Sequence, residues 1–175
     1  DAEIRAVREA RRTRKATGPL AEYSFGAVAK GYAVDRALAV LKARGVTRAL
    51  VNAGGEVGVL GSGWTAGVQH PRNRGALLTS VRLDEGRAIA TSGDYENAFV
   101  VDGQRFHHLL TPATGMPALE VQSVSVVAPN CAEADIWATA LFVMGPERAM
   151  ALARQHPELD VLLVDAQGRV TTSDG

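Results

Sequence analysis

The chain has 175 residues, 46% of them hydrophobic, and its 19 lysines and arginines balance 19 aspartates and glutamates. A chain of this size and apolar content can bury a substantial core as one globular domain. The absence of net charge argues against a dedicated nucleic-acid-binding protein. The single cysteine, Cys131, excludes an intrachain disulfide and a cysteine-cluster metal site, and no apolar run reaches membrane-spanning length.

The first part of the sequence predicts two helices. Residues 1–15 carry a thin apolar stripe among many arginines, a pattern typical of a surface helix that ends near Gly18-Pro19. A second helix is expected from about residue 28 to residue 44, with Gly45 at its end. Its buried side is expected to comprise Ala33, Ala37, Val40 and Leu41.

Short β-strands are expected next, because apolar runs alternate there with Gly, Asn and Asp turn signals. Helices return near the C-terminus: one begins at Cys131, another opens at Pro146, and a hairpin around residues 166–168 closes the chain. Segregated helices and strands favour an α+β fold with a largely antiparallel sheet, in a single domain over 1–175. The expected strands span residues 48–52, 57–60, 64–69, 78–83, 88–91, 98–101, 105–109 and 123–128.

The helix from Cys131 carries the first chemical signal. Asn130 with Glu133 three residues later is typical of a helix start, and Gly145-Pro146 is typical of a helix end. Within it, Asp135 and Thr139 are four residues apart, so they project from one face and can offer two oxygens to one hard cation. The alternative is a solvated aspartate near the first turn and a threonine bonded to the carbonyl four residues back.

Three glycine-rich segments are candidates for ligand contact. Ser24 to Gly31 opens the second helix with small residues, and Lys30 would lie in its first turn, where a cation is disfavoured by about 0.3–1 kcal/mol. That position suggests a phosphate or carboxylate partner, although a surface lysine is the alternative, and the P-loop spacing is absent. Backbone amides could contact a ligand in two further loops, which contain Gly54 and Gly55, and Thr91, Ser92 and Gly93. The alternative is an ordinary turn, since Gly-Gly after a strand is more often only that.

Two adjacent histidines, His107 and His108, precede a Gly/Pro-rich loop. Neighbouring residues of a strand face opposite sides, so only one of them is expected to face inward. That inward histidine is a candidate general base, and the alternative is a histidine satisfied in the core. A zinc-binding helix is not supported, since none of the four histidines has a histidine four residues away.

In chain order, six segments resemble the ApbE family, the FAD:protein FMN transferases. They read SFGAVAKGYAVD at 24–35, VNAGGE at 51–56, WTAGVQHP at 64–71, ATSGDYE at 90–96, HHLLTPATGMP at 107–117 and ADIWATALFVMG at 134–145. The resemblance implies an ApbE-like, T-fold-like architecture. It also implies Mg2+-dependent transfer of FMN from the substrate FAD to a threonine hydroxyl of a partner flavoprotein, with release of AMP.

Family positions map onto individual residues of this chain. The resemblance implies metal contacts from Asp135, Thr139 and the carbonyl of Ala27, FAD contacts from Ser24, Lys30 and Leu109, and a base at His107 or His108. It further implies a location in the periplasm or on the outer face of the cytoplasmic membrane. It does not identify the acceptor or the oligomeric state.

The sequence departs from the family pattern at Ser24 and Thr111, where the family has Asp, and in lacking the family's long upstream segment. We therefore expect the C-terminal catalytic portion of such an enzyme. Two alternatives stay open: a non-catalytic relative that binds FAD or a nucleotide, and a metal-dependent hydrolase of the FAD pyrophosphate.

Overall fold

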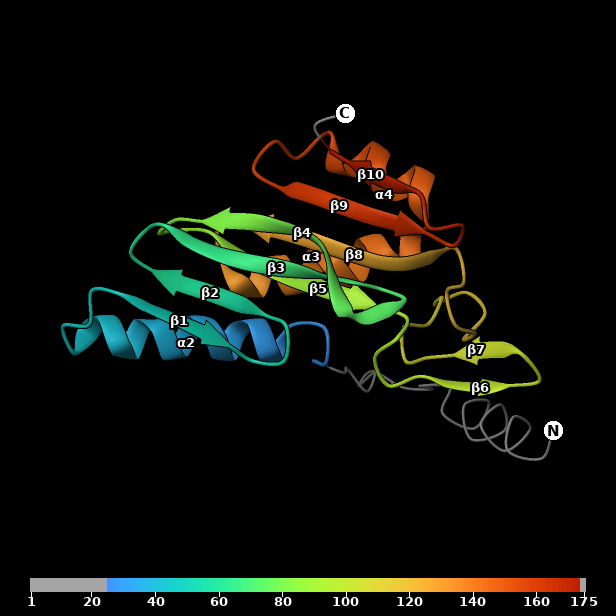
Figure 1. Cartoon of the computed structure of the whole chain (residues 1–175), viewed down its shortest axis with the longest axis horizontal. Helices are drawn as coiled ribbons and strands as arrows, with labels where there is room; N and C mark the ends of the chain where they lie inside the picture. The colour runs from blue at the N-terminus through green and yellow to red at the C-terminus, as the bar shows by residue number, and fades with distance from the viewer. Residues whose placement is uncertain (1–24, 174–175) are drawn as a thin grey trace, which may run out of the picture.

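The computed structural model describes residues 25–173, and their central element is a six-stranded antiparallel sheet in the order β1-β2-β5-β8-β9-β10 (Figure 1). Each pair of neighbouring strands in this sheet is antiparallel. The antiparallel α+β fold expected from the sequence is therefore confirmed. The strands are β1 (Ala49–Asn52), β2 (Val57–Leu60), β5 (Ala88–Gly93), β8 (Val121–Ala128), β9 (Asp160–Asp165) and β10 (Val170–Thr172).

Two further hairpins lie outside this sheet. Strands β3 (Trp64–His70) and β4 (Asn73–Leu83) pair with each other, as do β6 (Phe99–Val101) and β7 (Gln104–Phe106). The β3–β4 hairpin packs on the sheet through a cluster that includes Val68, Leu83 and Ile89. The β6–β7 hairpin projects beyond the end of the sheet (Figure 1).

Helices cover the other face of the sheet. Helix α2 (Ala29–Ala43) contacts β1 and β2, α3 (Cys131–Met144) contacts β5 and β8, and α4 (Pro146–Ala153) contacts β9. Strand β8 is consequently buried along its whole length, between α3 on one side and the β3–β4 hairpin on the other. Among the described helices, none has the length and apolar content needed to cross a membrane.

The alternation of side chains along β5 follows from this layering. Ala88 and Ala90 belong to the clusters under the helices, whereas Ile89 belongs to the cluster under the β3–β4 hairpin. Because successive residues of a strand face opposite sides, Thr91 must face the hairpin and Ser92 the helices. Adjacent residues of one motif are thus sorted onto opposite faces of the sheet.

Most expected elements are confirmed within a few residues, and three details are corrected. Ser92 and Gly93, which were expected in a loop, belong to β5. The buried side of α2 is formed by Gly31, Val34 and Leu38, while Ala33 and Val40 are exposed. Strand β7 ends at Phe106, so the two histidines after it are not part of a strand. The helix expected over residues 1–15 lies outside the described residues.

Candidate functional site

The first turns of α2 and α3 meet and bond each other's backbone. The backbone N–H of Gly31 in α2 donates to Oδ2 of Asp135 in α3, at 3.0 Å. In return, the Asp35 carboxylate of α2 accepts from the N–H groups of Cys131 and Ala132, both at 2.9 Å. Those two N–H groups belong to the helix start, where intrahelical partners are missing, so a carboxylate there is stabilising.

Gly31 makes this junction possible. A Cβ atom at that position would lie 2.3 Å from the Cys131 carbonyl oxygen, well inside van der Waals contact, so only glycine permits the approach. The thiol of Cys131 is buried beside the junction. Burial first, and then the negative charges of Asp35, Glu56 and Asp135, raise its pKa to about 12. The thiol is therefore protonated at neutral pH and is not a nucleophile.

Helix α3 begins and ends as its sequence predicts. The Asn130 side chain accepts from the Glu133 N–H at 2.9 Å and donates to the Glu133 carboxylate at 2.8 Å, and Gly145 ends the helix with a φ of 80°. Asp135 and Thr139 lie one turn apart on this helix; Asp135 is 4% exposed and Thr139 is half-buried. Because Oδ2 of Asp135 accepts from the Gly31 N–H, the orientation of the other carboxylate oxygen, Oδ1, is fixed as well.

The hydroxyl of Thr139 contacts β5. Its Oγ1 lies 3.1 Å from Oγ of Ser92, within hydrogen-bond distance. Thr91 instead bonds the Ser125 hydroxyl of β8, at 2.8 Å, on the hairpin side. At Gly93 the ring of Tyr95 lies over the backbone, 2.4 Å from where a Cβ would be. Of the two hydroxyls in this predicted run, that of Ser92 contacts the Thr139 side chain, whereas that of Thr91 bonds Ser125.

Lys30 has a negatively charged partner within the protein. Its Nζ forms an ion pair with Oε1 of Glu56, which is 2% exposed, whereas the lysine side chain is half exposed. The other oxygen, Oε2, is buried and has no hydrogen-bond partner among the described residues. Desolvation raises the pKa of Glu56, the Lys30 ammonium opposes this shift, and the negative Asp135 adds to it.

Glu56 is the residue that sequence reasoning missed. It follows Gly54 and Gly55, whose φ angles of 78° and 115° form the turn between β1 and β2. The N–H of Gly55 donates to the Asn52 side chain at 2.9 Å, which closes this turn. A carboxylate directly after two glycines was the available signal, but its burial depends on packing that the local sequence does not encode.

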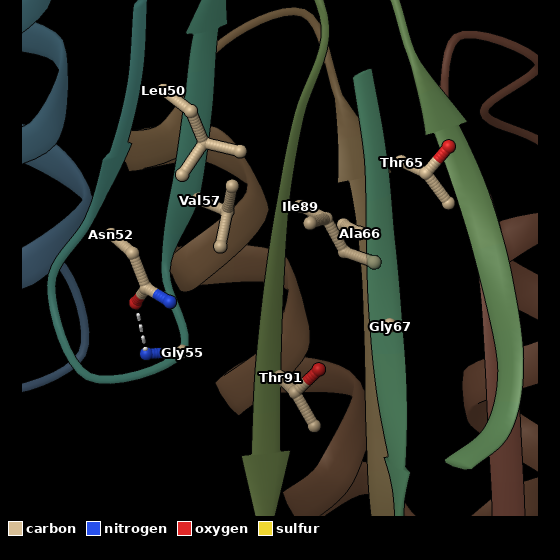
Figure 2. Close-up of a pocket in the computed structure, with 9 residues that line it drawn as sticks. All are labelled: Leu50, Asn52, Gly55, Val57, Thr65, Ala66, Gly67, Ile89 and Thr91. Atoms are coloured by element: carbon tan, nitrogen blue, oxygen red, sulfur yellow. Dashed lines mark hydrogen bonds between the residues drawn. The ribbon is translucent and has the colours of Figure 1, made fainter.

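A small cleft lies on the other face of β5, between the β1–β2 turn and β3 (Figure 2). Figure 2 shows Asn52 and Gly55 on one side, Ala66 and Gly67 on the other, and Thr91 of β5 between them. The volume is about 230 Å³, and none of the lining residues carries a charge. The complete lining is Leu50, Asn52, Gly55, Val57, Thr65, Ala66, Gly67, Ile89 and Thr91.

The two histidines occupy different environments. His107 is buried; its Nε2 lies 3.0 Å from the Ala118 carbonyl, and its Nδ1 accepts from the Leu109 N–H at 3.3 Å. Since a carbonyl can only accept, Nε2 carries the proton and the ring is neutral with both nitrogens engaged. Desolvation lowers the pKa of His107, and the ring packs edge-on against Phe142.

His108 is exposed. Its Nδ1 lies 3.1 Å from the Glu96 carbonyl oxygen and must therefore donate, which makes Nε2 the basic nitrogen of the neutral ring. The inward histidine, favoured by the sequence as a base, is thus the one whose nitrogens are both engaged. The outward one has the nitrogen suited to proton transfer.

Other predicted positions are placed as follows. Leu109 is buried in the main core cluster, and its carbonyl accepts from the Ala118 N–H at 3.0 Å. Ala27 is half-buried in the turn that opens α2. Ser24 lies outside the described residues. Thr111 begins the turn that follows the histidines, and its carbonyl accepts from the Gly115 N–H at 2.8 Å.

A bidentate ion pair fastens the β3–β4 hairpin beside this region. Both terminal nitrogens of Arg72 bond the Asp94 carboxylate at 2.6 Å, and Arg105 approaches the same carboxylate at 3.9 Å. Asp94 directly follows β5, so the pair anchors the turn whose Glu96 carbonyl bonds His108. A fork-to-fork arginine–carboxylate pair holds a defined orientation as well as a distance.

The residues around Asp135 fit a hard cation. The donors are oxygens of a carboxylate and a hydroxyl, which Mg2+ prefers, and the unpartnered Glu56 oxygen adds negative charge nearby. Over residues 25–173 there is no cluster of three or more His, Cys, Asp or Glu side chains able to hold a metal. Mg2+ here would therefore complete its shell with backbone, water or phosphate oxygens, as it does in many nucleotide sites.

Comparison with known proteins gives one consistent result. Residues 1–163 match the model of the ApbE family. The chain is 40% identical over 148 residues to an FAD:protein FMN transferase of Klebsiella pneumoniae (strain 342), covering 83% of this chain and 46% of that protein. It is 38% identical over 171 residues to an FAD:protein FMN transferase of Treponema pallidum (strain Nichols), covering 88% and 46%.

The fold agrees with a solved structure. The crystal structure of the ApbE protein from Thermotoga maritima superposes with a TM-score of 0.80 and 39% sequence identity, covering 86% of this chain and 51% of that one. The chain thus spans about half the length of the proteins it matches.

Proposed function

This chain belongs to the ApbE family, and on that premise we propose that it performs the transfer of FMN from FAD to a threonine hydroxyl of a partner flavoprotein. The curated relatives that it resembles are FAD:protein FMN transferases. The observation that carries the proposal is the pair Asp135 and Thr139, held by bonds from α2 and β5 next to the Lys30–Glu56 ion pair.

The reaction exchanges one phosphorus–oxygen bond for another. The threonine oxygen bonds to the phosphorus of the FMN half, the phosphoanhydride bond to the AMP half breaks, and AMP leaves with the bridging oxygen. The threonine proton passes to a base. Such a transfer is accelerated chiefly by positioning the reactants and by stabilising negative charge on the phosphate oxygens.

Asp135 and Thr139 would hold Mg2+ through their side-chain oxygens, with the Ala27 carbonyl as a further candidate ligand. A bound Mg2+ supplies Lewis-acid neutralisation of the phosphate oxygens. The Gly31 N–H keeps the Asp135 carboxylate in one orientation, so the charge is already in place before a ligand arrives.

Lys30 provides positive charge at the start of α2. Glu56 holds its ammonium, and half of the lysine side chain is exposed. Helix starts favour anions, so a pyrophosphate near this turn would meet both the ammonium and the positive end of the helix dipole. We assign Lys30 to phosphate binding and Glu56 to holding Lys30 in place.

His108 is the proposed base for the threonine proton. It is exposed, and its donation to the Glu96 carbonyl directs the basic Nε2 away from the backbone. His107 is assigned a structural role, because both of its nitrogens are engaged in the core. The periplasmic or membrane-surface location stays a prediction of the family resemblance.

Mass analysis tests the proposal. The protein is incubated with FAD, Mg2+ and a threonine-containing acceptor from a flavoprotein, with Asp135→Asn as the matched control. The expected result is an acceptor heavier by one FMN group, together with AMP, and neither product in the control. AMP formed without an acceptor would instead indicate a pyrophosphate hydrolase, and FAD binding without either product would indicate a non-catalytic relative.

A further inference from the structure

Ser92 contacts the one candidate metal ligand that has a rotatable proton. The Oγ atoms of Ser92 and Thr139 are 3.1 Å apart, although the residues come from different elements, β5 and α3. Ser92 lies within the paired part of β5, opposite Val124 of β8, so its backbone position is fixed by the sheet. A fixed hydroxyl thus faces the Thr139 side chain.

The orientation of a threonine hydroxyl on a helix is not determined by the helix itself. Threonine divides between two χ1 rotamers there, because its Oγ1 can also donate to the carbonyl four residues back. For Thr139 that carbonyl belongs to Asp135. A cation needs a lone pair of Oγ1, so the hydroxyl proton must point elsewhere, toward a fixed acceptor.

We propose that Ser92 is a positioning residue for metal binding: its Oγ accepts the Thr139 proton and so presents a Thr139 lone pair to the cation. This inference rests on the proposed function, and it concerns the same site. The Asp135 carboxylate is held by Gly31 of α2, and the Thr139 hydroxyl is held by Ser92 of β5. Each side-chain ligand is thereby oriented by a different neighbouring element.

The opposite face of β5 provides a matched control. Thr91 and Ser125 form a second hydroxyl–hydroxyl pair, at 2.8 Å, one residue away along the strand but toward the β3–β4 hairpin. Ser125→Ala removes a hydroxyl from that pair, just as Ser92→Ala removes one from the Ser92–Thr139 pair. Both substitutions delete one oxygen beside a threonine, but only Ser92 contacts a candidate ligand.

The test measures affinity for Mn2+ alone, by the electron paramagnetic resonance signal of free Mn2+ during titration of the purified protein. Partners that orient metal ligands typically contribute about 10- to 100-fold in affinity, so we expect Ser92→Ala to weaken Mn2+ binding by about 10-fold. Ser92→Thr, which keeps a hydroxyl, should restore binding to within about threefold of the unchanged protein. Ser125→Ala should leave the affinity unchanged.

Thermal melts show whether each variant is folded. If Ser92→Ala does not fold, Ser92→Cys takes its place, because it keeps the size but hydrogen-bonds weakly. Equal Mn2+ affinity in Ser92→Ala and the unchanged protein, or equal weakening by Ser125→Ala, overturns the inference. If Asp135→Asn weakens Mn2+ binding while Ser92→Ala does not, only the proposed role of Ser92 is wrong. If the unchanged protein binds no Mn2+, both the role of Ser92 and the proposed metal-dependent function are wrong.

Discussion

On the helix-covered face of β5, Ser92 adjoins a cluster of charged and hydroxyl groups, whereas on the face toward the β3–β4 hairpin Thr91 lines an uncharged cleft. The helix side contains Lys30, Glu56 and Asp135, each bonded to a neighbour from another element. One strand thus separates two chemical environments by the alternation of its side chains. Under the proposed function, phosphate and metal chemistry belongs to the helix side.

The largest effect is expected from Asp135→Asn. The amide oxygen can still accept from the Gly31 N–H, so the fold should persist, but the anionic oxygen donor is lost. We expect the rate of Mg2+-dependent transfer to fall by more than about 100-fold. Loss of a residue that only orients a metal ligand typically costs about 10- to 100-fold, and Asp135 is itself a proposed ligand. Steady-state kinetics over a range of Mg2+ concentrations provides the measurement. If the variant shows the same Mg2+ dependence as the unchanged protein, the metal does not bind at Asp135.

Separate substitution of the two histidines tests which of them is the base for the acceptor threonine. His108→Asn should reduce transfer by about 100-fold while FAD binding is retained, as expected for the loss of a general base. His107→Asn should instead reduce the free energy of unfolding, by about 1–3 kcal/mol, because buried hydrogen bonds to Ala118 and Leu109 are disturbed. Transfer rates and denaturation curves on both variants separate these outcomes, and the opposite pattern would return the base to His107.

Removal of Lys30 tests the ion pair. Lys30→Ala leaves the buried Glu56 carboxylate without its cation, so we expect a loss of about 1–3 kcal/mol in the free energy of unfolding, together with weaker FAD binding. In the double variant with Glu56→Gln, most of the stability should return but the FAD affinity should not. Equal FAD affinity in Lys30→Ala and the unchanged protein would contradict the assignment of Lys30 to phosphate binding.

A smaller effect concerns pH. Burial raises the pKa of Glu56 above its usual 4.5, so the folded protein holds this proton more tightly than the unfolded chain. The resulting stabilisation is fully present below about pH 4.5 and is lost as the pH rises through the folded pKa. The stability of the unchanged protein relative to Glu56→Gln should therefore decrease as the pH rises above about 4.5, in denaturant titrations at constant ionic strength. A difference that is constant with pH would show that this carboxyl group is not perturbed.

Features determined by local sequence could be predicted. Glycine and asparagine turns set the strand bounds, and the Asn130–Glu133 cap fixed the start of α3, so the relation of Asp135 to Thr139 followed from helix periodicity alone. The segregated order of strands and helices likewise indicated an antiparallel α+β fold.

Features determined by contacts between distant segments could not be predicted. The buried side of α2 is set by the approach of Gly31 to Cys131, 100 residues later, rather than by the most apolar stripe of the helix. The sequence predicted a loop at Ser92 and Gly93, whereas β5 continues to Gly93, and it did not indicate which of Thr91 and Ser92 faces the helices. The burial of Glu56 and the pairing of Arg72 with Asp94 also depend on tertiary packing.

The most direct measurement is the anomalous difference density of a crystal grown with Mn2+ and FAD. We predict a Mn2+ peak bonded to the carboxylate of Asp135 and the hydroxyl of Thr139, on the helix side of β5, with the FAD phosphates beside Lys30. A Mn2+ peak in the cleft of Asn52, Gly55 and Thr91, with the Asp135 and Thr139 oxygens bound only to protein groups, would contradict the account.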